Sequence, residues 1–243
     1  MRFDDITTMV FDFDGTLATC PYDFKHMRRS VLRIAEEFEL APAQLDGFGL
    51  LEMIAEGAEL LDGDPARAEA FRATALEQLG AIEYEAAATT RLLPGVVDAL
   101  VGLRAVGFRM GIVTRNSTAA VRRILGDIAL PVETILCRED VARPKPHIDH
   151  VRQALHLLGE IPVRALMVGD HPTDIQMGKA IGMATVAVAT GQSSEEDLRA
   201  AAPDALLPSV LSLAALLLAA RLERGAAAQE QSALTPPSAG RAR

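Results

Sequence analysis

Short runs of strand-forming residues, most of them apolar on both faces, place the strongest limit on how this chain can fold. Their high content of Val, Ile, Leu and Met is typical of parallel strands in a sheet that helices cover on both sides. Helical segments lie between the runs, and this alternation predicts right-handed crossovers in a doubly wound, Rossmann-like α/β sheet. The expected strands are residues 7–13, 108–114, 132–136, 164–170 and 184–190, and the expected helices between them are residues 95–106, 117–126, 147–158 and 174–181.

A helical segment interrupts this alternation after the first strand. Residues 20–90 contain stretches with helical spacing of apolar residues and no strand candidate, so we expect a small α-helical domain there, which we call the insert. The α/β core is then expected to comprise residues 1–19 and 91–223. Residues 224–243 are small, polar and proline-containing, and we expect them to form a disordered tail.

The charge balance excludes one broad class of partners. The 243 residues include 24 Lys and Arg against 33 Asp and Glu, which gives a formal net charge of −9. Sequence-independent binding of nucleic acid needs a basic face, so we expect no nucleic-acid partner. An acidic protein can still bind a phosphorylated metabolite if it builds a local cationic pocket.

Nothing in the sequence indicates secretion, a membrane span or a zinc site. The N-terminus runs directly into the first strand, and the longest apolar stretch, residues 205–220, is short, contains Pro208 and precedes charged residues. We interpret it as a strand end followed by a packing helix. Cys20 and Cys137 lack the spacing of a zinc site or a disulfide framework. We therefore expect a cytoplasmic protein without membrane contact.

Four motifs with polar side chains stand at the carboxyl ends of predicted strands or in the loop that follows one. Parallel sheets place their functional sites at these ends, so we expect the motifs to meet at one edge. The motifs are "DFDGT" (12–16), "VTRN" (113–116), "RPKP" (143–146) and "GDHPTD" (169–174).

Each motif also has a purely structural explanation when it is taken alone. The "DFDGT" motif can be a strand that ends in a polar turn. Thr114 to Asn116 can simply cap the following helix, and Asp174 can be an N-cap. Lys145, between two prolines, can be an exposed loop charge, which is the usual environment of a lysine. Each structural explanation is plausible for one motif, but four such motifs rarely fall at one edge of a sheet by chance.

Taken together, the motifs supply coherent chemistry for phosphoryl transfer. Asp12, Asp14 and Asp170 offer hard oxygen ligands that suit Mg²⁺, whose charge would relieve the repulsion among the carboxylates. Thr114 supplies a hydroxyl and Lys145 a positive charge, which the equatorial oxygens of a transferring phosphoryl group need. One carboxylate can then act as a nucleophile, and a second one two residues on can act as general acid and then as base.

In this order the four motifs resemble those of the haloacid dehalogenase-like hydrolase superfamily. The resemblance covers residues 5–220, and the insert is similar to the cap of phosphoglycolate-phosphatase-like members. It implies a phosphoric monoester hydrolase that uses Mg²⁺ and acts on a small phosphorylated metabolite through an aspartyl-phosphate intermediate.

The same resemblance implies roles for individual residues. Asp12 would be the nucleophile and Asp14 the acid and base. Thr114 would donate a hydrogen bond to the phosphoryl group, and Lys145 would neutralise the nucleophile and the phosphate. The residues expected to hold Mg²⁺ are Asp12, Asp14 (through its main-chain carbonyl), Asp170 and Asp174 (as a ligand or in support of one). The residues expected to contact the substrate or its phosphate are Gly15, Arg115 and Asn116.

The sequence leaves the substrate open. His171 stands where family members often have Ser, and Ile148 stands where a proline often completes the lysine motif; neither replaces a group that the chemistry needs. Lys25, Arg28 and Arg29, near the start of the first helix of the insert, are candidate contacts for a substrate carboxylate. An ordinary solvated basic helix face explains them equally well.

Three other functions are compatible with some or all of these motifs. A sugar phosphomutase of the same superfamily would form the same acyl-phosphate and return the phosphoryl group to a rotated intermediate. A phospho-switch similar to a response-regulator receiver also combines acids, Thr and Lys around Mg²⁺, but a nucleophile on the first strand beneath an insert disfavours it. A non-catalytic binding protein on an inherited fold would not need all the reactive groups.

Overall fold

A parallel sheet forms the centre of the computed structural model, which describes residues 3–234 and their side chains as far as residue 224. Within these residues the sheet has six strands in the order β3-β2-β1-β4-β5-β6. Every neighbouring pair is parallel, and β1 lies next to the point where the strand order reverses. The strands are β1 (Thr8–Phe11), β2 (Arg109–Val113), β3 (Thr134–Leu136), β4 (Ala165–Gly169), β5 (Ala184–Val188) and β6 (Ala205–Leu207).

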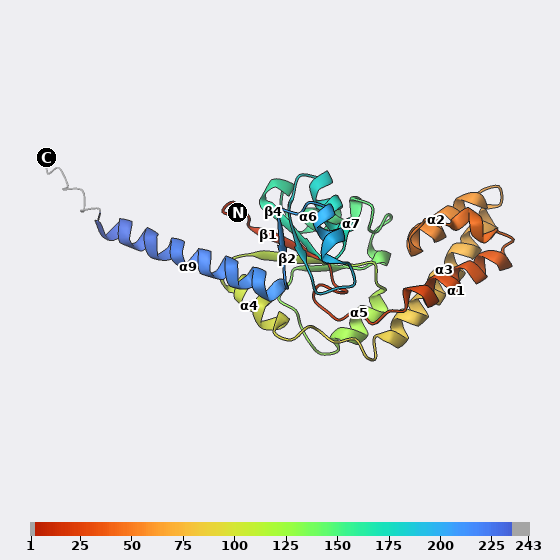
Figure 1. The fold of residues 1–243 in the computed structure, drawn as a ribbon, viewed down its shortest axis with the longest axis horizontal. Coiled ribbons are helices and arrows are strands. Elements are labelled where there is room, and N and C mark those ends of the chain that lie inside the picture. The colour runs from red at the N-terminus through yellow and green to blue at the C-terminus, as the bar shows by residue number, and fades with distance from the viewer. Residues whose placement is uncertain (1–2, 235–243) are drawn as a thin grey trace.

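Helices cover both faces of this sheet (Figure 1). Those of the core are α4 (Val96–Ala105), α5 (Thr118–Leu125), α6 (Asp149–Leu157), α7 (Pro172–Ala180), α8 (Glu195–Ala200) and α9 (Val210–Leu234). Because strand side chains alternate between faces, Met9 and Phe11 of β1 share a buried cluster with side chains of α4, α5 and α9. Val10 instead packs in a second cluster with side chains of α6 and α7. The predicted doubly wound α/β fold is confirmed.

The elements follow the sequence prediction closely, with ends shifted by a residue or two. The predicted strand end and packing helix within residues 205–220 are β6 and the first turns of α9. Helix α8 is not predicted from the sequence, because six residues are too few to display an apolar period. The side chain of Ser194 caps α8 by accepting a hydrogen bond from the backbone N–H of Asp197.

The insert builds a hydrophobic core of its own from helices alone. Met27, Val31, Met53, Phe71 and Leu79 are among the residues of this separate buried cluster. In Figure 1 the insert lies at one end of the molecule, and α9 projects at the opposite end. The elements of the insert are α1 (Phe24–Glu37), the short 3₁₀ helix η1 (Pro42–Leu45), α2 (Leu50–Leu60) and α3 (Pro65–Ala86).

Two adjacent segments connect the insert to the core. The backbone N–H of Thr19 on the outgoing segment donates to the carbonyl of Arg91 on the returning one at 2.8 Å. Ala18 and Leu92 form an antiparallel bridge next to this bond. The two connections are therefore held side by side, which defines where the insert can be placed relative to the sheet.

The C-terminal segment differs from the expected disordered tail. Residues 224–234 continue helix α9, whereas residues 235–243 lie outside the described residues. Alanine, glutamine and glutamate, which are good helix formers, dominate "RGAAAQEQSAL", and they extend a helix that packing against α4 has already started. Among the described residues, no helix is both long enough and apolar enough to cross a membrane.

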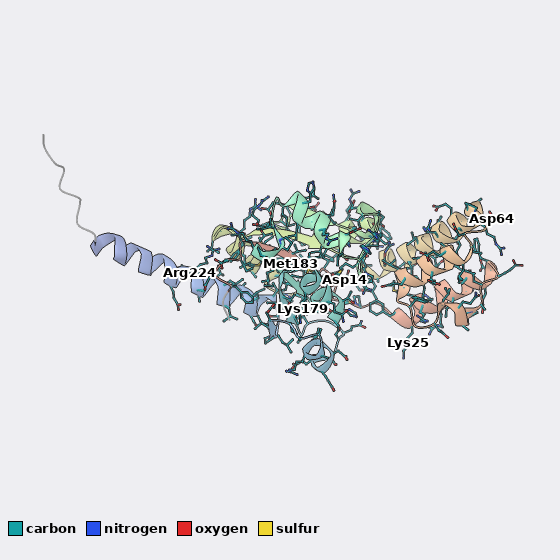
Figure 2. The ribbon with its side chains drawn as sticks, turned by 90° about the horizontal axis from the view of Figure 1, so that it is seen from above. Asp14, Lys25, Asp64, Lys179, Met183 and Arg224 are labelled. Carbon is teal, nitrogen blue, oxygen red and sulfur yellow. The ribbon has the colours of Figure 1, made fainter. Side chains whose placement is uncertain are left out.

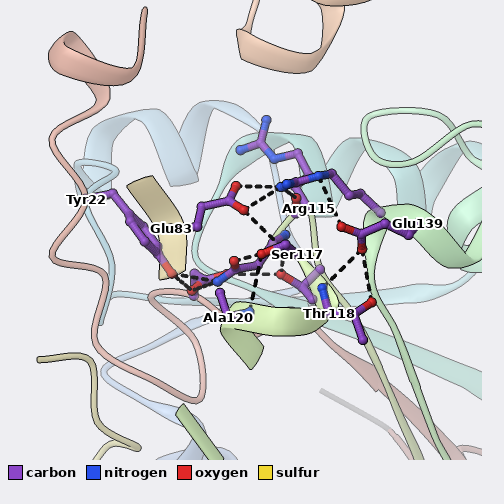
Figure 3. Close-up of polar contacts among 11 residues, drawn as sticks. Tyr22, Glu83, Arg115, Ser117, Thr118, Ala120 and Glu139 are labelled. Carbon is purple, nitrogen blue, oxygen red and sulfur yellow. Dashed lines mark hydrogen bonds and ion pairs between the residues drawn. The ribbon is translucent and has the colours of Figure 1, made fainter. Parts of the chain in front are cut away.

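A buried ion pair joins the insert to the core (Figure 3). Glu83, in the last turn of α3, accepts hydrogen bonds at 2.6 Å from Arg138 in the 3₁₀ helix η2 (Arg138–Asp140). Their side chains are only 8% and 5% exposed. Glu83 also accepts the backbone N–H of Ser117 at 3.2 Å, and Arg138 donates to the carbonyl of Arg115 at 3.0 Å. The insert is thereby bonded to the loop between β2 and α5.

We expect Glu83→Gln to destabilise the protein, because the charge of Arg138 would then lack its buried partner. Loss of one member of such a pair typically lowers the free energy of unfolding by about 3 kcal/mol or more. Glu69→Gln is the matched control, since Glu69 pairs with Arg72 where the side chains are 68% and 45% exposed. That substitution should cost about 1 kcal/mol or less. Urea unfolding measures both values, and equal small losses in the two variants would contradict a stabilising role for the buried pair.

Candidate active site

The carboxylate of Asp12 is held immediately beyond the end of β1. The backbone N–H of Asp12 donates to the carbonyl of Val168 at 2.8 Å, which prolongs the pairing of β1 with β4 by one residue. Its Oδ1 accepts the backbone N–H of Phe13 at 2.7 Å and lies 2.6 Å from Nζ of Lys145. Asp12 is 7% exposed, so a charged carboxylate is stable there only because these donors replace water.

Asp14 lies two residues on and is held by a different set of donors. Its carboxylate accepts hydrogen bonds from Thr114 Oγ1 at 3.0 Å, Asn116 Nδ2 at 3.0 Å and the hydroxyl of Tyr22 at 3.1 Å. Burial, and secondarily the charge of Asp12, raise the pKa of Asp14 to about 6, although these hydrogen bonds oppose the shift. The hydroxyl of Thr114 therefore contacts Asp14, whereas the sequence analysis expects it to contact a phosphoryl group.

Two glycines make room for the carboxylate of Asp170. Gly15 has φ +83°, and a Cβ built on it would lie 2.4 Å from Oδ2 of Asp170. A Cβ on Gly191 would lie only 1.6 Å from the same oxygen. Gly15 thus shapes the turn after β1 and leaves space beside it, which is a structural reason for the glycine in the first motif.

Lys145 links two carboxylates that lie far apart in the sequence. Its Nζ contacts Oδ1 of Asp12 at 2.6 Å and Oδ1 of Asp174 at 2.9 Å, and the residue is 4% exposed. Burial by itself lowers the pKa of Lys145, but the two carboxylates outweigh that effect and leave the pKa raised. Arg143, the other cation of this motif, instead donates to Asp149 at 2.9 Å and remains exposed.

Three of the carboxylates form a cluster that can hold a divalent cation. Oxygen atoms of Asp12, Asp170 and Asp174 all lie within 4.8 Å of one another. Burial raises the pKa of Asp170 to about 8 and that of Asp174 to about 6, and the charge of Asp12 adds to both shifts. Such repulsion is the condition that a bound cation relieves. The carboxylate of Asp14 is not part of this cluster.

His150 supports the loop that carries Lys145, a role that the sequence does not predict. Its Nδ1 accepts the backbone N–H of Lys145 at 3.1 Å, and its Nε2 lies 3.1 Å from the carbonyl of Leu136, to which it donates in the neutral tautomer. Burial, followed by the charge of Lys145, lowers the pKa of His150 to about 4. The ring therefore stays neutral and ties the loop to the end of β3. A lone histidine in a helix carries no signal of this role.

Tyr22 is a second residue that sequence reasoning does not find. It lies on the outgoing connection to the insert, yet its hydroxyl donates to Asp14 and accepts from Asn116 Nδ2 at 2.6 Å. Figure 3 shows Tyr22 and its polar contacts in the same region as Glu83. One side chain of the connecting segment is therefore part of the site itself.

A cavity of about 780 Å³ lies over these residues, between the core and the insert. Asp12, Asp14, Asp170 and Thr114 line it on the core side, together with Arg115. Within the part of the chain that the structure describes, the guanidinium of Arg115 donates no hydrogen bond to the protein, so it is available to an anion.

The expected contact residue Asn116 also lines the cavity, but its amide is engaged by Asp14 and Tyr22. His171 also lines the cavity, and its Nδ1 lies 2.7 Å from Oγ1 of Thr173.

Comparison with known proteins identifies relatives of this arrangement. Residues 9–188 match the family model described as haloacid dehalogenase-like hydrolase. The chain is 30% identical over 200 residues to the phosphoglycolate phosphatase of Rhodospirillum rubrum, across 77% of this chain and 81% of the relative. It is also 30% identical over 235 residues to the pyrophosphatase PpaX of Bacillus pumilus, across 89% of this chain and 99% of the relative.

The fold is shared with a solved structure as well. A protein from Bacteroides fragilis, described as a haloacid dehalogenase-like hydrolase, superposes with a TM-score of 0.64 at 24% identity. The superposition covers 86% of this chain and 99% of that protein. At this identity the likeness supports the fold alone. The two curated relatives support a phosphatase, and the phosphoglycolate phosphatase supports the hydrolysis of phosphate esters.

We expect protonation of His150 to destabilise the folded protein at acid pH. Its pKa falls from 6.5 in the unfolded chain to about 4 in the folded one. Between these values the unfolded chain binds more protons, so the free energy of unfolding decreases as the pH falls from 6.5 to 4. At about 1.4 kcal/mol for each pKa unit, the contribution amounts to about 3 kcal/mol.

Urea unfolding at several pH values, on the wild type and on His150→Asn, isolates this effect, because the carboxylates of the site titrate in both proteins. His156→Asn, which alters an exposed histidine of the same helix, is the control. A variant at position 150 with the full pH dependence of the wild type would show that the buried ring is not its source.

Proposed function

This chain belongs to the haloacid dehalogenase-like hydrolase family, and we propose that it is a Mg²⁺-dependent phosphatase that hydrolyses a small phosphorylated metabolite. The observation that carries the proposal is the different environment of two neighbouring carboxylates. Asp12 lies 2.6 Å from the ammonium group of Lys145, whereas Asp14 accepts hydrogen bonds from neutral donors and has a raised pKa. A phosphatase of this kind needs one charged nucleophile and one group that moves protons.

The first step transfers the phosphoryl group to the protein. A carboxylate oxygen of Asp12 attacks phosphorus, and the bond from phosphorus to the ester oxygen breaks. Asp14 gives its proton to the departing oxygen, for which a pKa of about 6 is suited near neutral pH. Arg115, which lines the cavity, binds the phosphoryl oxygens, and Lys145 balances the charge of the nucleophile.

The second step returns Asp12 to its starting state. A water molecule attacks the phosphorus of the aspartyl-phosphate and passes a proton to Asp14, which is now ionised. The bond between phosphorus and the Asp12 oxygen breaks, and inorganic phosphate leaves. Thr114 and Asn116 keep Asp14 in place through both steps, because their hydrogen bonds fix its carboxylate.

The residues present fit a magnesium ion. Asp12 and Asp170 offer carboxylate oxygens in one cluster, and we propose that the main-chain carbonyl of Asp14 completes the protein ligands. Asp174, which is bonded to Lys145, either binds the ion directly or holds its neighbours. When bound, the ion supplies positive charge that offsets the carboxylates and the phosphoryl oxygens.

The two catalytic aspartates should respond differently to substitution. Asp12→Asn removes the nucleophile, so turnover of every phosphate ester should vanish and no phosphoenzyme should form. Asp14→Asn leaves the attack possible but removes the proton for the leaving group, a contribution typically worth about 10²–10⁴-fold. The loss should be severe for alkyl phosphates and smaller for p-nitrophenyl phosphate, whose leaving group departs without a proton.

Steady-state rates on both esters and the intact mass of each variant test these expectations. Asp127→Asn, an exposed aspartate outside the cavity, is the control for the substitution itself. Turnover by Asp12→Asn would overturn the choice of nucleophile. Product analysis with a hexose 1-phosphate separates hydrolysis from the phosphomutase alternative, because a mutase would return the 6-phosphate and release no phosphate.

Activity should require a hard divalent cation. We expect EDTA to abolish hydrolysis of p-nitrophenyl phosphate and added Mg²⁺ to restore it, because the cluster consists of carboxylates alone. Ca²⁺ should restore little activity, since it prefers longer bonds and more ligands and so misaligns Asp12. Phosphate release measured across a titration of each metal tests both the requirement for a cation and the preference for Mg²⁺ over Ca²⁺. Full activity in EDTA would contradict the proposed metal dependence.

A further inference from the structure

The insert presents an apolar surface to the cavity. Phe24 and Met27 of α1, Leu50 and Leu51 of α2, and Leu79 of α3 all line it. Phe24 is 41% exposed, and its ring lies against that of Tyr22 at a centroid distance of 6.1 Å. Covering an exposed aromatic ring with an apolar group lowers the free energy, because both surfaces leave water. The apolar surface of the insert therefore suits an apolar part of a ligand.

The three basic residues of the insert that the sequence suggests are not placed to bind a substrate carboxylate in the cavity. Of the three candidates from the sequence, Arg28 alone lines the cavity, while Lys25 and Arg29 are exposed elsewhere on the insert, where Figure 2 labels Lys25. The guanidinium of Arg28 is already committed to the fold of the insert. It donates to the carbonyl of Phe48 at 2.7 Å, and at 3.3 Å both to the carbonyl of Leu45 and to the carboxylate of Asp46.

The charges elsewhere in the cavity also oppose a second anionic group. Asp14 and Asp197 contribute carboxylates to its lining, and Glu83, which also lines it, is already paired with Arg138. Lys145 is taken up by Asp12 and Asp174, which leaves Arg115 for the phosphoryl group. The volume of about 780 Å³ lies in the range of roughly 300–1,000 Å³ that is usual for pockets that bind drug-sized molecules. A two-carbon carboxylate would leave most of this space and the apolar wall without contacts.

We propose, on the basis of the proposed phosphatase activity, that the preferred substrate is a phosphomonoester whose leaving alcohol is uncharged and largely apolar, with Phe24 as a residue that determines this specificity. The phosphoryl group lies at Asp12 and Arg115, and the apolar part of the alcohol covers Phe24, Leu50 and Leu51. The neutral side chains of Gln176 and Gln192 line the remaining cavity, where they can bond a hydroxyl or a carbonyl of the substrate.

Three alkyl phosphates with the same need for a proton on the leaving group test this proposal on the full chain. They are 2-phenylethyl phosphate, ethyl phosphate and phosphoglycolate. We expect kcat/KM for 2-phenylethyl phosphate to exceed the values for the other two by about 10-fold or more, because burial of a phenyl ring contributes on that scale. A higher kcat/KM for phosphoglycolate than for 2-phenylethyl phosphate would overturn the inference.

A pair of phenylalanine substitutions locates the effect. Phe24→Ala should lower the ratio of kcat/KM for 2-phenylethyl phosphate to that for ethyl phosphate by about 10-fold, chiefly through KM. Phe48→Ala is the matched control, since Phe48 lies on the same insert and is 39% exposed but does not line the cavity. That variant should keep the wild-type ratio. An unchanged ratio in Phe24→Ala, or an equal fall in both variants, would overturn the role of Phe24.

Failure of the inference and failure of the proposed function give different results. If the esters are hydrolysed but the carboxylate-bearing one is preferred, the phosphatase activity stands and the apolar specificity falls. If none of the three is hydrolysed with Mg²⁺ present, and acetyl phosphate adds no phosphoryl group to the wild-type protein by intact mass, the proposed function itself falls. Hydrolysis with the predicted order of preference supports both.

Discussion

The contact of the Lys145 ammonium group with Asp12 and Asp174 is the interaction on which the rest of the site depends. Three acidic residues converge where the strands end, and their carboxylates repel one another in surroundings with little water. Lys145 is buried beside Asp12 and Asp174, and its positive charge offsets part of their negative charge. His150 keeps the loop of Lys145 against the end of β3. Without this cation, folding would bury the carboxylates of Asp12 and Asp174 with no positive charge in contact with them.

The parallel sheet explains why such distant residues meet. Because β1 pairs with β2 on one side and β4 on the other, the residues that follow these strands come out at one edge. Asp12, Thr114 and Asp170 follow three adjacent strands in this way. The turn after β1 must also pass close to Asp170, and only a residue without a Cβ fits there, which accounts for Gly15. The motif at residues 12–16 therefore supplies both the carboxylates of the site and the glycine that the turn requires.

The junction between insert and core is built into the site and not merely next to it. Glu83 bonds the backbone of Ser117, and Tyr22 bonds both Asp14 and Asn116. Each of these contacts is made either with Asp14, the acid of the proposed mechanism, or with the loop between β2 and α5, whose Asn116 bonds Asp14. Any displacement of the insert that moves Glu83 or Tyr22 must alter the surroundings of Asp14. The wall that we propose to contact the substrate is thus physically connected to Asp14, the proposed proton donor.

The fold class, the family and the positions of the four motifs could be predicted from the sequence, because apolar periodicity and short motifs are local properties of the chain. Membership in the family is confirmed by the match over residues 9–188. The motif resemblance already assigned Lys145 to the charge beside Asp12. The tertiary structure added the burial of Lys145 and its second contact, with Asp174. It alone brought in Tyr22, Glu83 and His150, which resemble ordinary residues of a loop and two helices. Their roles come from burial and from partners far away in the chain, and no local pattern encodes either.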